Sequence, residues 1–485
     1  MTAQTDIFRR LVQDHMAAAP VQLGADAAAG EAVHRMRLEK ATCAIVVDGD
    51  GRPRGILTEQ DVVRRLAYQA DASTAVEQTM TAPVVTVEES DYLFHAIALM
   101  RRKGLRHIPV TGERGEVRGM LALHESLAVL SDQSMRLIDD LTHEETIEGL
   151  KAVKAAQVRL AEALFEDGVP VPEVQELLTE INRDLHRRVL RRELQSMRDD
   201  GWGESPVPFA LIIMGSGGRG ENFLYPDQDN GFILRDYDDG EHERIDRWFV
   251  ALAERLTRGL DAIGFPFCEG NVMATNPLWR KTLSRWREQI GHWMVRRSPA
   301  MLRNGDIFFD FCHAWGEFEM SVTLREFIGD IAARNVGFLR AMYQIQMDDR
   351  VALGWFGRLS TKRGEAGERR VNLKYGGTLP LVEGIRLLAL RHGVPATSTL
   401  GRIRALAAND VITSDQGDYL AGAFRHITYL MLRQQIADFK AGRKVGNWVP
   451  VANLSRREKD YLVACFRAVE DLRGRLKLEF AGSVF

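Results

Sequence analysis

The feature that most restricts the fold of this chain is an internal repeat in its first 130 residues. Pro20-Val21 recurs as Pro83-Val84, and RGIL at 54–57 recurs as RGML at 118–121, which gives an offset of 63 to 64 residues. In each copy a helical period precedes two β-branched runs that a Gly-containing turn separates, and a second helical period follows. This alternation predicts a β-α-β-β-α unit that the chain uses twice.

The repeat resembles a tandem pair of cystathionine-β-synthase (CBS) domains. The resemblance rests on RHIPV at 106–110, GILTEQD at 55–61 and TMTAPVVTV at 79–87. In that family the two copies pack together, often bind AMP, ADP or ATP, and often join two chains. The resemblance therefore implies an adenylate ligand and a homodimer formed through the pair.

The family's ligand residues carry over to Thr58 and Asp61, which would hold the ribose hydroxyls and phosphate. The second copy has Ala122 and Glu125 at the matching positions, so we expect one intact site at most. The alternative is structural: Thr58 caps a helix and Asp61 lies in its first turn, where the helix dipole favours an acid. The two roles are compatible.

A helical composition follows the repeat. Apolar residues recur at spacings of three and four from 131 to 200, and Gly168 and Pro170 interrupt the pattern. The pattern predicts two long helices that connect the repeat to the rest of the chain.

The segment most informative about chemistry is PVPFALIIMGSGGRGENFLYPDQDNGFILRD at 206–236. FALIIM at 209–214 has the length of a strand buried on both faces, and the glycines of GSGGRG permit a tight turn that can approach an anion. Asp227 and Asp229 would share one face of a strand, about 7 Å apart. Two carboxylates beside such a turn are what a two-metal phosphoryl-transfer site requires.

This arrangement resembles the nucleotidyltransferase superfamily that includes DNA polymerase β. GSGGRGE at 215–221 resembles the uridylyltransferase that modifies the nitrogen-regulatory PII protein, and PDQDN at 226–230 is closer still to a nucleotidyltransferase family that carries CBS modules. The resemblance implies an NTP substrate and Mg²⁺ or Mn²⁺ at Asp227 and Asp229. The phosphate-binding residues that it implies are Gly215, Ser216, Gly217 and Arg219. Asn230 stands where the PII-modifying enzymes usually have an apolar residue, which leaves the nucleotide and the acceptor open.

The superfamily uses a third metal-binding carboxylate on a later strand. The string DIFFDFCHAWGE at 306–317 is an apolar run with acids in it, and the family pattern places the third acid at Asp310. Asp306 competes with it but would begin the strand. The structural alternative for Asp310 is a buried carboxylate paired with an arginine.

Between the second and third acids, the sequence predicts a helix that begins at Asn276 and Pro277 and ends before Pro299. Trp279, Trp286 and Trp293 fall seven residues apart, which favours a core stripe over a docking surface. The basic residues of this segment could attract a triphosphate or an acidic partner, or could simply be a solvated helix face.

The remainder of the chain is rich in helical periods. NLKYGGTLPLVEGIRLLAL at 372–390 resembles the helical substrate-binding domain of the same family. Lys374 and Arg386 are therefore candidates for phosphate or acceptor contacts, with ordinary surface or capping roles as the alternative.

Composition excludes several other classes of protein. The chain has 64 Lys and Arg against 67 Asp and Glu, a net charge of −3 that argues against a nucleic-acid binder. Its four cysteines lie far apart, without a disulfide framework or zinc spacing. It shows neither a signal peptide nor an apolar run long enough to cross a membrane. We therefore expect a cytoplasmic protein without a membrane partner.

These patterns predict a multidomain α+β protein. Its expected segments are a tandem CBS pair at 1–130, a helical connector at 131–200, a mixed-sheet nucleotidyltransferase domain at 201–330 and a helical substrate-binding domain at 331–485. The predicted function is metal-dependent transfer of NMP from an NTP to a protein or small-molecule acceptor, regulated by adenylate. The alternative is a non-catalytic sensor that binds NTP and adenylate without turnover.

Overall fold

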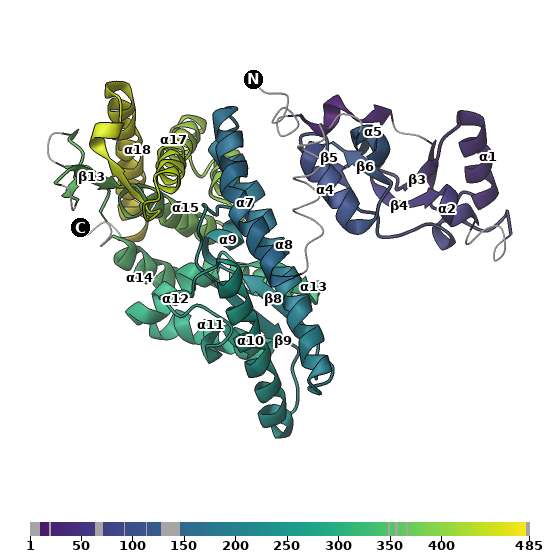
Figure 1. Ribbon diagram of the computed structural model, residues 1–485, viewed down its shortest axis with the longest axis horizontal. Coiled ribbons are helices and arrows are strands. Elements are labelled where there is room, and N and C mark those ends of the chain that lie inside the picture. The colour runs from purple at the N-terminus through teal and green to yellow at the C-terminus, as the bar shows by residue number, and fades with distance from the viewer. Residues whose placement is uncertain are drawn as a thin grey trace. The chain divides into compact units, whose positions relative to one another are not determined.

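The chain forms two compact units, 1–144 and 145–485 (Figure 1). The computed structural model describes residues 10–18, 21–63, 71–91, 93–112, 114–127, 146–347, 350–354, 357–364 and 367–481. Pro20 and the first part of the predicted connector, 131–145, lie outside the described residues.

The first unit contains the predicted repeat. One copy has β2 (Val21–Gly24), α1 (Ala29–Glu39), β3 (Cys43–Val47), β4 (Pro53–Thr58) and α2 (Glu59–Asp61). The other has β5 (Val87–Glu88), α4 (Leu93–Lys103), β6 (His107–Thr111), β7 (Val117–Ala122) and α5 (Leu123–Leu127), with β1 (Ala17–Ala18) added to its sheet. The β-α-β-β-α prediction is confirmed for both copies.

The two copies have matching registers. Cys43 pairs with Thr58 across β3 and β4, and His107 pairs with Ala122 across β6 and β7. In both sheets the first strand runs parallel to the second and the second antiparallel to the third. Thr58 and Ala122 therefore occupy equivalent positions at the end of a strand.

The second unit begins with two long helices, α7 (Ile147–Glu166) and α8 (Val171–Asp199), which lie side by side. Gly168 and Pro170 lie between the two helices, as the sequence predicts, and Pro172 is in the first turn of α8, where proline is accepted. Both helices pack on α10 (His242–Ile263), and α8 also contacts β11 (Cys312–Gly316). The helices are thus part of the core of this unit.

The central sheet of the second unit is mixed, as predicted. Its strand order is β10-β9-β8-β11, with β8 at Phe209–Ile213, β9 at Asn230–Leu234 and β10 at Arg280–Thr282. β9 and β10 are parallel, while β8 runs antiparallel to both β9 and β11. All residues of β8 are buried, which confirms the strand buried on both faces.

Helices cover both faces of this sheet. Phe209 of β8 and Phe232 of β9 contact Phe249 of α10 on one face. α11 (Leu283–Arg296) contacts β9, and α13 (Phe318–Arg334) contacts β8. Because β8 and β9 are antiparallel neighbours, the carboxyl end of β8 meets the amino end of β9, where the glycine turn and the acid pair lie.

The remaining elements form a largely helical region. The helices are α12 (Pro299–Phe308), α14 (Val336–Gln346), α15 (Leu379–Arg391), α16 (Thr399–Ala408), α17 (Ser414–Lys440) and α18 (Arg456–Phe480). A small sheet contains β12 (Lys362–Arg363), β13 (Arg369–Asn372) and β14 (Trp448–Pro450), and a π-helical turn, η8 (Lys374–Thr378), leads into α15. The short 3₁₀ helices are η2 (Val12–Asp14), η4 (Val76–Gln78), η5 (Asp239–Glu241), η6 (Pro277–Trp279) and η9 (Val451–Asn453).

The predicted single helix from Asn276 to Pro299 is wrong. Asn276 caps only η6, because β10 follows immediately, and Thr282 caps the true helix α11. Pro299 is the first residue of α12, which Ser298 caps, and does not end the preceding helix. The tryptophans are nevertheless core residues, as favoured: Trp279, Trp286 and Trp293 are all buried.

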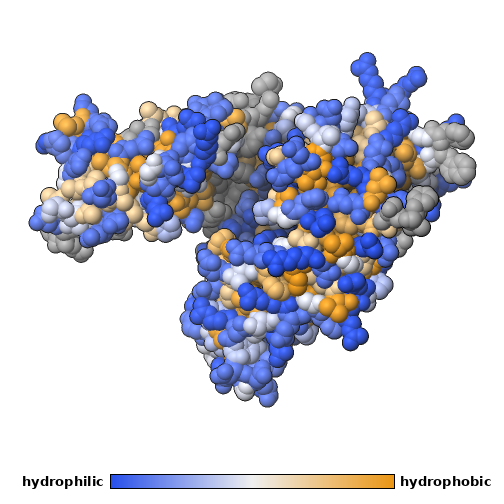
Figure 2. Space-filling view, turned by 180° about the vertical axis from the view of Figure 1, so that it is seen from behind, coloured by the Kyte–Doolittle hydropathy of each residue, from blue (hydrophilic) through white to orange (hydrophobic). Residues whose placement is uncertain are grey.

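On the face shown in Figure 2, hydrophobic areas of the larger unit are interspersed with hydrophilic ones. Within the described part of the chain, each helix is either too short or too polar to cross a membrane. The finer division at residues 130, 200 and 330 stays a prediction.

Candidate functional site

The glycine-rich turn folds as a single helical turn, α9 (Gly215–Arg219), directly after β8. Gly215 has a φ of +57°, and a Cβ atom there would lie 2.5 Å from Oδ2 of Asp229. A side chain at residue 215 would therefore both strain the backbone and collide with this carboxylate. Glycine is what allows the turn to touch the second acid of the pair.

The acid pair lies just before β9 and not within it, because the strand begins at Asn230. Exposure nevertheless alternates along the segment: Asp227 is exposed and Asp229 half-buried, whereas Gln228 and Asn230 are fully buried. The Gln228 amide donates to the carbonyls of Thr257 (3.0 Å) and Phe265 (2.9 Å). These internal bonds fix the segment so that Asp227 and Asp229 face away from the core, as the spacing predicts.

Burial and mutual repulsion disfavour two charges at this position. Burial raises the pKa of Asp229 to about 6, and the neighbouring Asp227 contributes to the rise. Burial also raises the pKa of Asp227. Lys374 is close enough to lower the pKa of both acids, so the structure brings this predicted residue to the acid pair. The thiol of Cys268 donates a hydrogen bond to Asp229.

The two carboxylates fit a divalent cation whose remaining ligands come from a triphosphate. Within the described residues neither carboxylate forms a salt bridge, and no cluster of three or more His, Cys, Asp or Glu side chains could hold a metal alone. Mg²⁺ usually binds through one or two carboxylates together with substrate phosphates and water. Asp227 and Asp229 supply the two carboxylates, and the glycine turn beside Asp229 leaves room for the phosphates.

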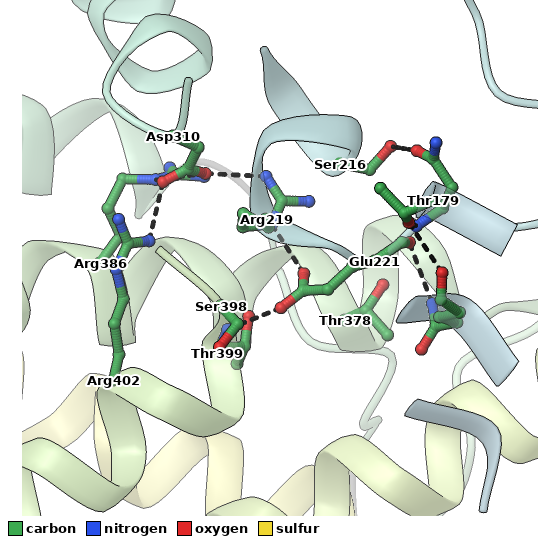
Figure 3. A network of polar contacts seen from close by, with 12 residues as sticks. Thr179, Ser216, Arg219, Glu221, Asp310, Thr378, Arg386, Ser398, Thr399 and Arg402 are labelled. Carbon is green, nitrogen blue, oxygen red and sulfur yellow. Dashed lines mark hydrogen bonds and ion pairs between the residues drawn. The ribbon is translucent and has the colours of Figure 1, made fainter. Parts of the chain in front are cut away.

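The structure pairs Asp310 with arginines. Asp310 lies between α12 and β11, has no exposed surface, and binds three guanidinium groups: Arg386 at 2.6 Å, Arg402 at 2.7 Å and Arg219 at 2.8 Å (Figure 3). Burial opposes its ionisation, but the three arginines outweigh that effect and hold the pKa of its carboxyl far below the usual range. This is the structural alternative described above, a buried acid paired with arginine.

Asp306 does not begin a strand, contrary to expectation, because α12 continues to Phe308. It accepts a hydrogen bond from Arg386, whose side chain is almost fully buried. Arg386 is thus ion-paired with Asp306 and Asp310 inside the protein. It is not exposed for a contact with a ligand at Asp227 and Asp229. Lys374, by contrast, is exposed.

The other residues predicted to hold phosphate lie on α9. The Ser216 hydroxyl donates to Oδ1 of Asn222 at 2.9 Å. Arg219 lies between two acids, since it binds Asp310 and also Glu221 at 2.7 Å. Glu221 in turn accepts a hydrogen bond from the backbone N–H of Thr399 at the first turn of α16 (2.6 Å). A buried network of charges therefore joins the glycine turn to α15 and α16.

The first unit has a cavity of about 640 Å³ beside the predicted adenylate residues. Thr58 and Asp61 line it, together with Thr42, Arg106 and His107. Thr58 caps α2 and forms a reciprocal capping box with Asp61, so the structural role is confirmed. Asp61 also accepts a hydrogen bond from the hydroxyl of Thr81 at 3.1 Å.

Four residues at or near the site were not among the predicted site residues. Cys268 and Glu269 come from the loop between α10 and β10, and they reach the acids only because that loop runs beside residues 226–230. Glu221 is the last residue of the GSGGRGE string, so its position in that string could have indicated it as a site residue. Arg402 lies far along the chain, and only the fold brings it to Asp310.

The second unit has a mixed sheet, with a glycine turn and an acid pair where its two inner strands β8 and β9 meet. The first unit has a CBS-like repeat. Together these features define a protein of the nucleotidyltransferase class with a CBS pair. The family models agree: residues 155–300 match "Putative nucleotidyltransferase DUF294", 337–480 match "Putative nucleotidyltransferase substrate binding domain", and 12–68 and 76–125 match the CBS domain. The chain therefore belongs to the CBS-domain-containing nucleotidyltransferase family that its strings indicate.

Similarity to curated proteins is partial. An uncharacterized protein of Methanopyrus kandleri is 31% identical over 101 residues, which are 20% of this chain and 52% of that protein. Inosine-5'-monophosphate dehydrogenase of Mycobacterium tuberculosis is 33% identical over 81 residues, 16% of this chain and 15% of the enzyme. The chain thus spans about half the length, or less, of these two relatives.

Solved structures match a similar share of the chain. A CBS domain protein from Pyrobaculum aerophilum complexed with AMP is 22% identical, and the match covers 27% of this chain and 98% of that one with a TM-score of 0.24. A CBS-domain-containing protein from Agrobacterium tumefaciens is 28% identical over 24% of this chain and 96% of that chain, with a TM-score of 0.22.

Proposed function

We propose that the protein transfers a nucleoside monophosphate from an NTP to a protein or small-molecule acceptor, with release of pyrophosphate. The observation that carries this proposal is the acid pair Asp227 and Asp229, whose second acid lies against the glycine turn at Gly215. The two carboxylates hold Mg²⁺ or Mn²⁺, and the backbone of the turn with the Ser216 hydroxyl holds the phosphates. Bound metal supplies Lewis-acid stabilisation of the charge on the transferring phosphoryl group.

The other predicted site residues take different roles in this proposal. Lys374 contacts a phosphate or the acceptor in this proposal, and its lowering effect on the pKa of both acids supports that role. Arg219 holds the turn through its two carboxylate partners. Asp310 and Arg386 join the sheet domain to the helical region, because each uses its charge inside the buried network.

The second candidate is a sensor that binds NTP without turnover. The pairing of Asp310 with three arginines favours this candidate, because it removes the third acid from the metal pair. Pyrophosphate release separates the two functions. With each NTP and Mg²⁺, the enzyme should release pyrophosphate in the presence of a cell lysate that contains the acceptor. A sensor would bind the NTP and release none.

We expect adenylate to bind the first unit at one site. Replacing Thr58→Ala together with Asp61→Ala should abolish binding of AMP, ADP and ATP to the 640 Å³ cavity, because it removes the hydroxyl and the carboxylate that face the ligand. Changes at Ala122 and Glu125 should alter the affinity little. Calorimetry measures both, and two equal adenylate sites per chain would contradict the single-site assignment.

Adenylate should also change the affinity for NTP or the turnover. A ligand can shift a conformational equilibrium only through different affinities for the two states, and the coupling of the two bindings must be reciprocal. Deleting residues 1–130 should leave a metal-dependent protein that no longer responds to AMP. If NTP affinity and turnover in the full chain are the same with and without saturating AMP, the CBS pair only joins two chains.

A further inference from the structure

The loop between the glycine turn and the acid pair is held by side chains from outside the sheet. This loop, residues 221–224, has to place two groups of the proposed site at once, because the turn ends at Gly220 and the first acid is Asp227. Its polar backbone groups are contacted by side chains of α7 and α8, the two helices that precede the sheet.

Three hydrogen bonds make this attachment. The Gln175 amide of α8 donates to the carbonyl of Glu221 at 3.0 Å. The backbone N–H of Asn222 donates to the Thr179 hydroxyl of α8 at 3.0 Å (Figure 3). The Lys154 ammonium of α7 donates to the carbonyl of Leu224 at 3.1 Å.

Two of these side chains, Thr179 and Lys154, are held by further hydrogen bonds, and all three are buried. Thr179 donates its hydroxyl proton to the Gln175 carbonyl at 2.7 Å, so the hydroxyl uses both its donor and its acceptor capacity. Lys154 also donates to Gln157 at 2.8 Å and to Asn182 at 3.0 Å. All three side chains are at most 5% exposed. Buried side chains held by several hydrogen bonds fix a loop more rigidly than solvated ones do.

Lys154 also reaches the other side of the acid segment. Its ammonium lies 4.4 Å from the centre of the Phe265 ring. The carbonyls of Phe265 and Pro266 accept hydrogen bonds from the side chain and the backbone N–H of Gln228, the residue between the two acids. One buried lysine, whose pKa burial lowers to about 7, therefore contacts both the loop that precedes Asp227 and the Phe265–Pro266 segment that binds Gln228.

We infer that Lys154, Gln175 and Thr179 are positioning residues, which set the distance between the phosphate-binding turn and the metal-binding acids. The inference rests on the proposed function for the identity of the ligand, but its structural part does not. It also gives the helix pair a specific role: a displacement of α7 or α8 relative to the sheet moves the loop that joins the two halves of the site.

The chain offers a matched pair of threonines for the test. Thr179 and Thr428 both lie inside long helices, both are at most 2% exposed, and both donate to the carbonyl four residues earlier. Only Thr179 also accepts the loop N–H. Thr179→Val removes this acceptor at nearly constant volume, Thr179→Ser keeps it, and Thr428→Val controls for loss of a buried helical hydroxyl.

The first measurement is the affinity of the full chain for Mn²⁺ with tripolyphosphate, a probe that has no base or ribose for the first unit to bind. Thr179→Val should weaken binding roughly tenfold, the equivalent of about one hydrogen bond. Thr179→Ser and Thr428→Val should stay within about twofold of wild type. Gln175→Leu and Lys154→Met should act in the same direction as Thr179→Val. Equal affinities of Thr179→Val and Thr428→Val would overturn the inference.

The second measurement needs no ligand. Hydrogen exchange should become faster in Thr179→Val through residues 215–230, and not in Thr428→Val. Faster exchange at Asn222 alone would show that the helix pair does not position the site. The proposed function fails separately, if wild type does not bind Mn²⁺ with tripolyphosphate or if Asp229→Asn binds it equally well.

Discussion

Asp227→Asn and Asp229→Asn should each reduce nucleotidyl transfer by roughly three orders of magnitude or more. Bound metal contributes several kcal/mol to stabilising the charge of the transition state, and each variant removes one of the two carboxylates that hold it. The fold should survive, because both side chains face away from the core. The measurement is turnover in saturating Mg²⁺, and near wild-type turnover in either variant would refute the assignment of the acid pair.

The same variants should not lose stability. Because burial raises the pKa of Asp229 to about 6, the folded chain binds this proton more tightly than the unfolded chain does. Ionised Asp229 therefore costs stability, and this cost grows as the pH rises from about 4 to 6 and persists above. At pH 8 without metal, Asp229→Asn should melt at the same temperature as wild type or slightly higher, and the advantage should vanish near pH 4.

Asp310→Asn should behave in the opposite way and destabilise the second unit by about 3–5 kcal/mol. The variant leaves three buried guanidinium groups without their shared carboxylate, and breaking a buried ion pair from one side costs this much. A loss of that size lowers the melting temperature by on the order of 10 °C. Thermal melting without metal measures it, with Asp227→Asn as the matched control that removes an acid lacking a salt bridge.

The sign of the pH dependence gives a second check on Asp310. Its pKa is far below that of the unfolded chain, so its contribution is fully present above about pH 4 and is lost as the pH falls toward its folded value. The difference in stability between wild type and Asp310→Asn should therefore shrink in acid. If metal-free melting of Asp310→Asn matches that of wild type, Asp310 is not held by the arginines, and a metal-binding role becomes the better assignment.

The sequence predicts most of the architecture because the information is local. The strand FALIIM and the alternation around Asp227 and Asp229 depend only on neighbouring residues, and the structure contains both. Each copy of the repeat is likewise recognised from its own short strings. The prediction for 276–299 failed because Asn276 and Pro277 are equally good signals for a 3₁₀ turn. The hydrogen bonding of β10 to β9, which ends that turn, involves residues about 48 positions away.

The contacts around the acids could not be predicted, because they are tertiary. Asp310 meets Arg386 and Arg402 from helices 76 or more residues later, and no spacing rule links these positions. Family resemblance placed Asp310 in the strand-like string 306–317, but α12 continues to Phe308 and β11 begins only at Cys312, so Asp310 lies between the two. Lys154 and Thr179 stand in ordinary amphipathic helices, where only the packing of the helices on the loop reveals their role.

The central claim is that the acid pair transfers a nucleoside monophosphate, and label transfer tests it most directly. The full-length chain is incubated with a cell lysate, Mg²⁺ and each of the four α-labelled NTPs, with Asp229→Asn in parallel. The account predicts that wild type transfers label from at least one NTP to an acceptor and releases pyrophosphate, and that Asp229→Asn transfers none. Label transfer that is equal in the two proteins, or no transfer from any NTP with Mg²⁺ or Mn²⁺, would contradict it.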